Sequence, residues 1–403
     1  MSSAATVQQS ELTPDGVLAA VTDLLPQLRE RAQQTEDARR IPAETIAALQ
    51  ETGFFRLLQP ARHGGLEASP VQFYRGVRLI ASACGSTGWV SSVLGVHPWQ
   101  LALFDERAQA GVWGQDDSTL VSSSYAPMGR ARAVDEGGTP GFRFSGRWSF
   151  SSGCDHAQWV FLGGLVMGDD GNPVDFRTFL LPRADYVIDD VWDTIGLRGT
   201  GSNDILVEDV FVPEYRTLSF IDTGRCECPG QDVNPAPLYR LPFAMVFSNS
   251  ISVPVIGMAQ GAYEAYVGWT KDRVRASTGT QASADSFNQL RIAEASYKID
   301  NAVASIERNI DEALTLATAG EKIPMPLRVR SRRDQVNATG SAITAVDRLF
   351  ESAGGRALKS GTPIQRFWRD AHAGRVHAIN DPEKAQVMFG QFELGLKVHD
   401  AWL

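Results

Sequence analysis

The chain has 403 residues, of which 43% are hydrophobic and 21% charged, an ordinary globular composition long enough for two or three packed domains. Its formal net charge of −9 argues against nucleic acid or an anionic membrane as the main partner, because binding to phosphate needs a basic face. The N-terminus lacks the basic flank and apolar run of a signal peptide, and no segment approaches the roughly 18 consecutive apolar residues of a membrane helix. We therefore expect a soluble, cytoplasmic protein without a membrane partner.

The first part of the chain, from Thr13 to about Phe104, has the hydrophobic periodicity of helices. Its apolar residues predict helices over residues 16–37, 41–58 and 71–95. A segment with prolines and two adjacent glycines, PARHGGLEASP, separates the last two. We predict an N-terminal helical domain over residues 1–118.

The periodicity then changes to the alternation that is typical of strands. In GFRFSGRWSFSSG, aromatic residues recur at even spacing: Phe142, Phe144, Trp148 and Phe150. Further short apolar runs follow, each bounded by Gly, Pro or Asp, and no helical stretch separates them. We therefore predict a compact antiparallel β-domain over residues 119–230. Neither a Rossmann nor a P-loop fingerprint is present.

Helical periodicity returns after the proline-rich crossover CPGQDVNPAPLYRLP. The clearest predicted helix runs from Ser286 to Gly320, where a glycine can end it. Its apolar stripe contains Ile292, Ala295, Ile299, Val303, Ile306, Ile310 and Leu314. We predict a C-terminal helical bundle over residues 231–403, so that the fold class is α+β.

The four cysteines, Cys84, Cys154, Cys226 and Cys228, are too few and too scattered for a disulfide framework. Cys226 and Cys228 could both contact a metal, but no second pair with the spacing of metal ligands follows. Free thiols are the favoured interpretation, and we predict no metal site.

Two of the six histidines lie five residues apart in RDAHAGRVHAIND, from Arg369 to Asp381. Because an unperturbed imidazole has a pKa of about 6.5, His372 and His377 could exchange protons near neutral pH and act in catalysis. The second interpretation is structural, since histidines in the last turns of a helix commonly interact with its free carbonyl groups. This stretch by itself favours the structural interpretation.

Several motifs together resemble those of acyl-CoA dehydrogenases. GLRGTGSNDILVEDVFVP is similar to their β-domain signature, and Gly354 and Gly355 resemble their paired-glycine flavin-binding turn. RDAHAGRVHAIND resembles the stretch that carries their catalytic glutamate, and the order of domains agrees. The resemblance implies an acyl-CoA dehydrogenase-like fold. The position of the glutamate falls on Ala378, which has no proton to exchange, and His377 stands beside it.

This replacement resembles the oxygenase components of two-component flavin monooxygenases, to which a separate NAD(P)H:flavin reductase supplies reduced flavin. CGSTGWVSSVLGVH, SSSYAPMG, SSGCDHAQW and QRFWRDAHAGRVHA are similar to the actinobacterial members that act on a phenolic seco-steroid of cholesterol catabolism. The resemblance implies ortho-hydroxylation of the phenol to a catechol with O2 and reduced FMN, or with reduced FAD. It also implies a homotetramer, because this fold places the flavin at a subunit boundary.

The resemblance further implies roles for individual residues. His377 would accept the proton of the phenol, which otherwise leaves near pH 10, and Ser152 would hydrogen-bond flavin N5 or its oxygen adduct. Arg273 would reach the flavin phosphate across a subunit interface, with Arg275 as the less favoured partner. The other implied flavin contacts are Trp89, Ser123, Ser124, Tyr125, Ala126, Pro127, Phe150, Ser151, Gly354, Gly355, His377 and Ala378. The implied substrate contacts are Tyr125, Arg375 and His372, of which the last two could instead form surface salt bridges.

Two of these assignments depend on the resemblance alone. Ser151 and Ser152 precede a glycine, and without the family they would be interpreted as turn residues. Phe150 stands where close relatives are expected to have tryptophan, and either ring can stack on a flavin.

Three alternative functions remain at this stage. The first is a hydroxylase of another phenol or aromatic compound with the same mechanism. The second is an acyl-CoA dehydrogenase, which would need a carboxylate base such as Asp381 or Glu383. The third is a helical scaffold or binding module, which would explain the bundle but not the flavin-type motifs.

Overall fold

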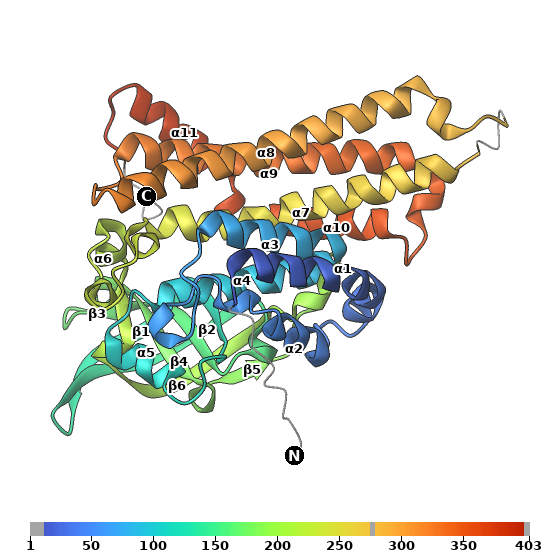
Figure 1. Ribbon diagram of the computed structural model, residues 1–403. Coiled ribbons are helices and arrows are strands. Elements are labelled where there is room, and N and C mark those ends of the chain that lie inside the picture. Colours follow the sequence, from blue (N-terminus) through green and yellow to red (C-terminus); the bar gives the residue numbers. More distant parts are fainter. Residues whose placement is uncertain (1–11, 275–278, 399–403) are drawn as a thin grey trace, which may run out of the picture.

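The structure is a computed structural model that describes residues 12–274 and 279–398. Figure 1 shows the blue N-terminal helices between the sheet, which lies below them, and the long helices of the C-terminal part, which lie above. The N-terminal helices are α1 (Pro14–Asp37), α2 (Ala43–Glu51), α3 (Pro70–Ala83), α4 (Gly85–Leu101) and α5 (Glu106–Trp113).

Local chemistry explains where these helices begin and end. The Thr13 side chain accepts a hydrogen bond from the Gly16 N–H at the start of α1, and Ser69 forms a capping box with Gln72 at the start of α3. The predicted helix over residues 71–95 is in fact two helices, because Cys84 has an extended backbone. The predicted helix over 41–58 ends early, since Gly53 adopts a left-handed conformation with φ of 81°.

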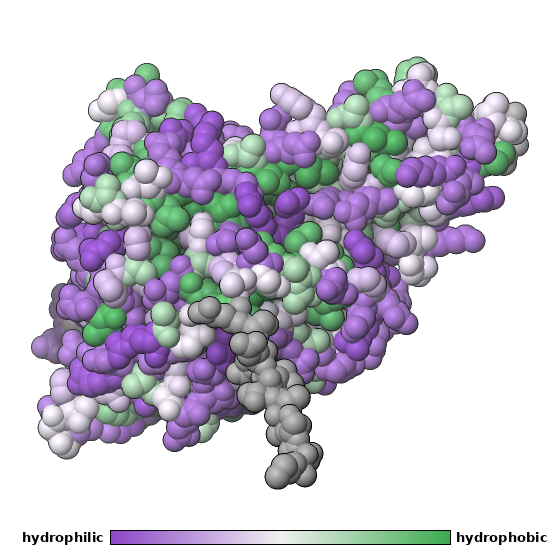
Figure 2. All heavy atoms as spheres, viewed as in Figure 1, coloured by the Kyte–Doolittle hydropathy of each residue, from purple (hydrophilic) through white to green (hydrophobic). Residues whose placement is uncertain are grey.

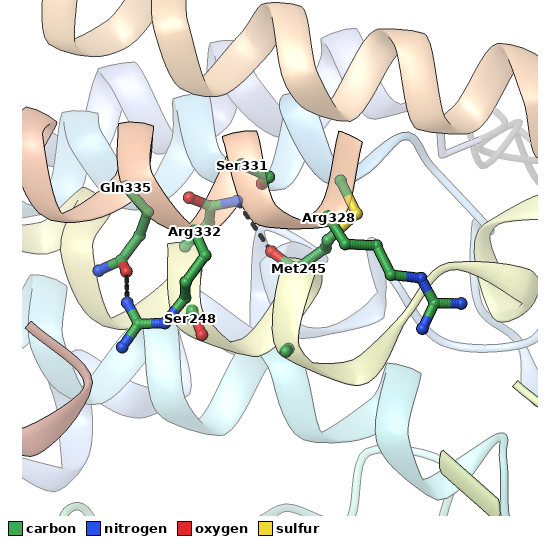
Figure 3. Close-up of a pocket in the computed structure, with 8 residues that line it drawn as sticks. Met245, Ser248, Arg328, Ser331, Arg332 and Gln335 are labelled. Atoms are coloured by element: carbon green, nitrogen blue, oxygen red, sulfur yellow. Dashed lines mark hydrogen bonds between the residues drawn. The ribbon is translucent and has the colours of Figure 1, made fainter. Parts of the chain in front are cut away.

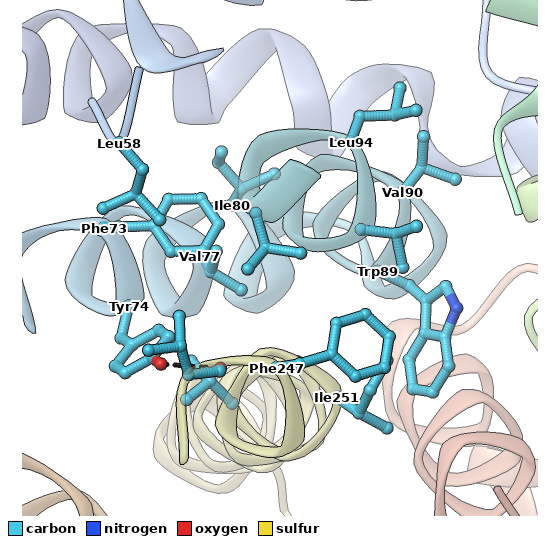
Figure 4. Packing of buried hydrophobic residues seen from close by; sticks show 14 of the residues in the cluster. Leu58, Phe73, Tyr74, Val77, Ile80, Trp89, Val90, Leu94, Phe247 and Ile251 are labelled. Atoms are coloured by element: carbon cyan, nitrogen blue, oxygen red, sulfur yellow. Dashed lines mark hydrogen bonds between the residues drawn. The ribbon is translucent and has the colours of Figure 1, made fainter. Parts of the chain in front are cut away.

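Every residue of α4 is buried, so this helix has no solvent-facing side. Figure 4 shows Trp89 of α4 beside Phe247 and Ile251 of α7, whereas Val90 and Leu94 point away from α7. A helix that is apolar on all sides must be enclosed by other elements. α4 is therefore the core element between the sheet and the bundle.

The described strands form one sheet of seven strands in the order β5-β6-β2-β1-β3-β4-β7. The sheet is mixed, because β1 and β3 run parallel whereas the other neighbouring pairs are antiparallel, and this corrects the expectation of a purely antiparallel domain. The short connection from Ser152 to Gln158 passes the start of β1, so β3 leaves in the same direction as β1. The strands are β1 (Val121–Glu136), β2 (Thr139–Ser151), β3 (Trp159–Met167), β4 (Pro173–Pro182), β5 (Val187–Asp189), β6 (Asn203–Pro213) and β7 (Thr217–Ser219).

Helices follow the sheet. They are α6 (Phe220–Arg225), α7 (Phe243–Asp272), α8 (Ser286–Thr318), α9 (Met325–Ala353), α10 (Pro363–Arg375) and α11 (Pro382–Glu393). α8 ends as predicted, with Gly320 at a φ of 76°. α7 is long and apolar enough to cross a membrane, but 94% of its apolar window is buried inside the protein, as in a core helix. The boundaries of the three domains remain a prediction.

The loop GLRGTGSN, residues 196–203, is clamped against α10. Leu197 donates its N–H to Asp370 Oδ1 at 2.7 Å, and Arg369 donates to the Ile195 carbonyl at 2.7 Å. Both partners lie in α10. A Cβ on Gly196 would lie 2.2 Å from the Arg369 carbonyl oxygen, so the loop approaches α10 closely only because this residue is glycine.

We predict that Gly196→Ala lowers the free energy of unfolding by about 1–3 kcal/mol, the usual range for overpacking. The added Cβ would meet backbone that cannot move aside without shifting α10. Gly224→Ala is the matched control, since no heavy atom lies within 4 Å of a Cβ built there. Chemical denaturation of the parent and both variants measures the effect, and equal stability of the two variants would contradict the clamp.

Candidate active site

The structure brings together three of the predicted site residues from distant segments. Trp89, in α4, donates its indole N–H to Ser152 Oγ at 3.1 Å, just beyond the end of β2. The ring of His377 lies 5.9 Å from that of Trp89, measured between centroids. His377 follows α10 and begins the short 3-10 helix η11 (Ala378–Asn380). Trp89 therefore links the end of the sheet to the predicted catalytic histidine.

Serine side chains line the neighbouring ends of β1 and β2. Ser124 donates to the Ser149 carbonyl at 2.8 Å, and the hydroxyls of Ser151 and Ser122 lie 3.4 Å apart. The ladder between β1 and β3 is irregular between Ser124 and Gly129. The predicted contacts Ala126 and Pro127 lie in this interval and are exposed, whereas Ser123 is buried.

Phe150 presents an aromatic ring to solvent next to these hydroxyls. Its side chain is 67% exposed although it lies within a strand, and its φ is 69°. A non-glycine residue with positive φ inside a strand is unusual, and here it coincides with a register shift between β2 and β6 from Trp148 to Ser151. The ring packs edge-on against Trp192, with centroids 6.0 Å apart. An exposed ring beside hydroxyl and peptide groups fits a flat ligand with a polar edge, as a flavin is.

The His377 imidazole is uncharged at neutral pH. Burial, together with the nearby Arg332 guanidinium, lowers the pKa of His377 to about 4. Its Nδ1 accepts a hydrogen bond from the Ile379 N–H at 3.2 Å. The neutral ring therefore carries its hydrogen on Nε2, and it can take up a proton at Nδ1 only by releasing Ile379.

His97 is a second candidate that sequence reasoning missed. It is fully buried in α4, and its Nδ1 must donate to the Val121 carbonyl because a carbonyl only accepts. Its Nε2 is thus an acceptor, and it has no hydrogen-bond partner among the residues that the structure describes. Burial lowers the pKa of His97 to about 4. Its sequence signal is a histidine within a helix that has no Asp, Glu, Lys or Arg.

Aromatic side chains surround Tyr125, the residue predicted to contact both flavin and substrate. Its ring contacts Phe247, Phe243 and Phe220 at centroid distances of 4.9, 5.8 and 6.4 Å, and that of His97 at 6.3 Å. Its hydroxyl donates to Gln100 Oε1. We call these rings the aromatic cluster. The cluster places the Tyr125 ring next to His97, whose Nε2 is an acceptor.

Comparisons with known proteins identify the family of this chain. Residues 19–113 match the N-terminal domain of acyl-CoA dehydrogenases, and residues 249–382 match their C-terminal domain. The chain is 58% identical, over 94% of its length and 98% of the relative's, to the flavin-dependent monooxygenase oxygenase subunit HsaA of Rhodococcus jostii. It is 54% identical to HsaA of Mycobacterium tuberculosis, over 95% of this chain and 96% of that one. The chain belongs to the oxygenase subunits of flavin-dependent monooxygenases.

A solved structure supports the same family. The crystal structure of 3-HSA hydroxylase from Rhodococcus sp. RHA1 superposes with a TM-score of 0.93 and 56% identity, covering 96% of this chain and 99% of that one. The predicted acyl-CoA dehydrogenase-like fold and the predicted enzyme class are thus confirmed. The chain is an oxidoreductase that uses reduced flavin.

The other predicted substrate contacts of this oxygenase subunit, His372 and Arg375, hydrogen-bond within the protein. His372 hydrogen-bonds the Trp368 carbonyl at 2.8 Å and pairs with Asp347 of α9 at 3.2 Å. These contacts turn His372 toward α9, whereas Arg375 donates to the Asn380 carbonyl. Contact of either residue with substrate stays a prediction.

The carboxylates considered for a dehydrogenase do not replace the missing glutamate. Asp381 caps α11 by accepting a hydrogen bond from the Glu383 N–H at 3.0 Å, and the Glu383 side chain is exposed. Ala378 is exposed at the start of η11.

A separate group of predicted flavin contacts lies at the ends of α7 and α9. Arg273 donates to the Ala353 carbonyl at 2.9 Å, and Gly354 follows with a φ of 74°. Gly355 begins the next 3-10 helix. These helix ends lie at the right of Figure 1, beyond the N-terminal helices. Arg275 lies outside the described residues.

A small cavity lies behind the His377 segment, between α7 and α9 (Figure 3). Its volume is about 10 Å³, which is room for about one water. Gln335, which lines it, donates to Asn380 Oδ1 of η11 at 2.8 Å. The cavity is too small for a flavin, and its lining supports η11 instead.

The cysteines are free thiols, as predicted. Among residues 12–274 and 279–398, no group of three His, Cys, Asp or Glu side chains is arranged to hold a metal ion.

Proposed function

We propose that this oxygenase subunit hydroxylates a phenolic seco-steroid ortho to its hydroxyl, giving a catechol, in cholesterol catabolism. The observation that carries the proposal is that α4 holds His97 with an acceptor nitrogen and also holds Trp89, whose ring lies 5.9 Å from that of His377. The similarity to HsaA and to 3-HSA hydroxylase supports the steroid as substrate. A phenol of another kind would meet the same groups.

We further propose that the flavin is reduced FMN, delivered by a separate NAD(P)H:flavin reductase, in a cytoplasmic enzyme. When bound, reduced flavin activates O2 and supplies the oxygen atom for the ring. Phe150 would cover the flat face of the flavin, and Ser123, Ser124, Ser151 and Ser152 would bind its polar edge. Buried side chains around Trp89 exclude water from the reacting atoms.

The lowered pKa values decide when the phenol loses its proton. An imidazole whose pKa is lowered to about 4 is a weak base for a resting phenol with a pKa near 10. As the ring gains oxygen, it loses electron density and its hydroxyl becomes far more acidic. The histidine therefore acts as a general base during oxygen insertion rather than before it.

We expect the purified protein to consume oxygen and form a catechol when it is given NADH, a flavin reductase, FMN and a phenolic seco-steroid. Simple phenols and an acyl-CoA with an electron-accepting dye complete the panel. Catechol formation from simple phenols but not from the steroid would contradict the substrate. Dye reduction by acyl-CoA without hydroxylation would contradict the reaction.

We predict that His377→Ala slows hydroxylation by roughly 10²–10⁴-fold at neutral pH, the usual contribution of a general base. Raising the pH toward 10 should partly restore the rate, because more of the phenol is then ionised in solution. His63→Gln, which removes a histidine that packs on Trp113, is the control. Single-turnover kinetics with reduced flavin measure the step.

His97→Ala, measured in parallel, distinguishes the two histidines. The free Nε2 of His97 can accept a proton without breaking a hydrogen bond, whereas His377 must release Ile379. Parental rates for His377→Ala together with a pH-rescued loss for His97→Ala would transfer the role of base to His97.

We also propose a homotetramer in which Arg273 and Gly354 of one subunit complete the flavin site of another. Apolar residues on α8, namely Phe287, Leu290 and Tyr297, are exposed, and apolar side chains gather on the protruding end of the bundle in Figure 2. Light scattering should give a tetramer. Arg273→Ala should weaken flavin binding but leave the tetramer intact. A fully active monomer would contradict this arrangement.

A further inference from the structure

A chain of hydroxyl groups leads from the clamped loop to Ser152. The Thr200 hydroxyl lies 2.9 Å from the Leu197 carbonyl oxygen and 2.7 Å from Ser202 Oγ. Ser202 Oγ lies 2.7 Å from Ser152 Oγ in turn. All three hydroxyl-bearing residues are buried. Each hydroxyl therefore has neighbouring protein groups, rather than bulk water, as hydrogen-bond partners.

The donor in each of these hydrogen bonds follows from the number of hydrogens available. A carbonyl only accepts, so Thr200 uses its one hydroxyl hydrogen on Leu197. Thr200 must then accept from Ser202, and Ser202 must accept from Ser152. At the other end, the Trp89 indole N–H only donates, and it donates to Ser152 Oγ. The hydrogen of Ser152 thus points at Ser202, away from any ligand.

The carbonyl that begins this chain is held from several sides. The Leu197 oxygen also accepts the Trp192 indole N–H at 2.9 Å, and the Leu197 N–H is bound by the buried Asp370 carboxyl. Leu197 has a φ of 51°, a conformation that a leucine keeps only when its surroundings impose it. The direction of the whole chain is therefore built into the folded protein before a ligand binds.

We propose that Thr200 and Ser202 are positioning residues that orient Ser152 as a hydrogen-bond acceptor, so that the site selects reduced over oxidised flavin. The proposal rests on the proposed function in one respect, the contact between Ser152 and flavin N5. Reduced flavin carries a hydrogen on N5 and donates there, whereas oxidised flavin has only a lone pair at N5. The remaining lone pair of Ser152 matches the first form and repels the second.

The experiment measures dissociation constants for FMN and, under anaerobic conditions, for chemically reduced FMN, by ultrafiltration without substrate or oxygen. Thr200→Val removes the hydroxyl at almost constant shape, and Ser202→Ala removes the next one. Either change frees the Ser152 hydrogen to turn toward N5. We expect oxidised FMN to bind about tenfold more tightly to each variant, the effect of replacing one repulsive contact by a hydrogen bond, with reduced FMN changed by less than about threefold.

Thr200→Ser keeps the hydroxyl and should retain the parental ratio of the two dissociation constants. If Thr200 had only a structural role, this ratio would not depend on whether the hydroxyl is present. Far-ultraviolet circular dichroism and thermal melting show whether each variant is folded. If either Thr200→Val or Ser202→Ala does not fold, the other still tests the proposal. If both are folded and keep the parental ratio while Ser152→Ala weakens reduced FMN, the positioning role is wrong. If Ser152→Ala changes neither affinity, the proposed contact with flavin fails, and the inference fails with it.

Discussion

The complete burial of α4 is the constraint on which the rest of the structure depends. A helix without a polar side must be covered all round, and here the sheet, α3, α7 and α10 supply the cover. Trp89 and His97 lie on this helix and are therefore held in surroundings with little water. The site is placed where the helical and β parts of the chain meet because both parts must pack on the same helix.

Low polarity around α4 also sets the chemistry of the site. The pKa values of His97 and His377 fall because burial penalises the charged imidazolium, and both rings stay neutral at physiological pH. Backbone groups then decide which nitrogen carries the hydrogen, and they decide differently for the two rings. The Val121 carbonyl leaves His97 with a free acceptor, whereas the Ile379 N–H leaves His377 with a free donor. The two neutral rings therefore present opposite hydrogen-bonding groups before a ligand binds.

The clamped loop, residues 196–203, contributes both to the packing of the protein and to the candidate active site. Gly196 brings the loop onto α10, and Asp370 holds its backbone. The same loop carries Thr200 and Ser202, whose hydroxyls continue to Ser152. The buried carboxyl on α10 therefore determines where a carbonyl lies in the β part of the chain, and that carbonyl determines which way a hydroxyl points. The packing of the loop on α10 thus influences the direction of the Ser152 hydroxyl through hydrogen bonds whose donors follow from the available hydrogens.

The sequence by itself determined the order of the parts and the helix ending at Gly320, and its resemblance to a known motif predicted that Ala378, beside His377, stands at the position of a glutamate. These depend on local periodicity, on local backbone preference and on alignment with a known motif. Only the tertiary structure separated His372 from His377, revealed the free nitrogen of His97 and broke the predicted helix at Cys84. The reason is physical: which way a buried side chain points, and which of its atoms carries a hydrogen, depends on partners that lie far away in the sequence.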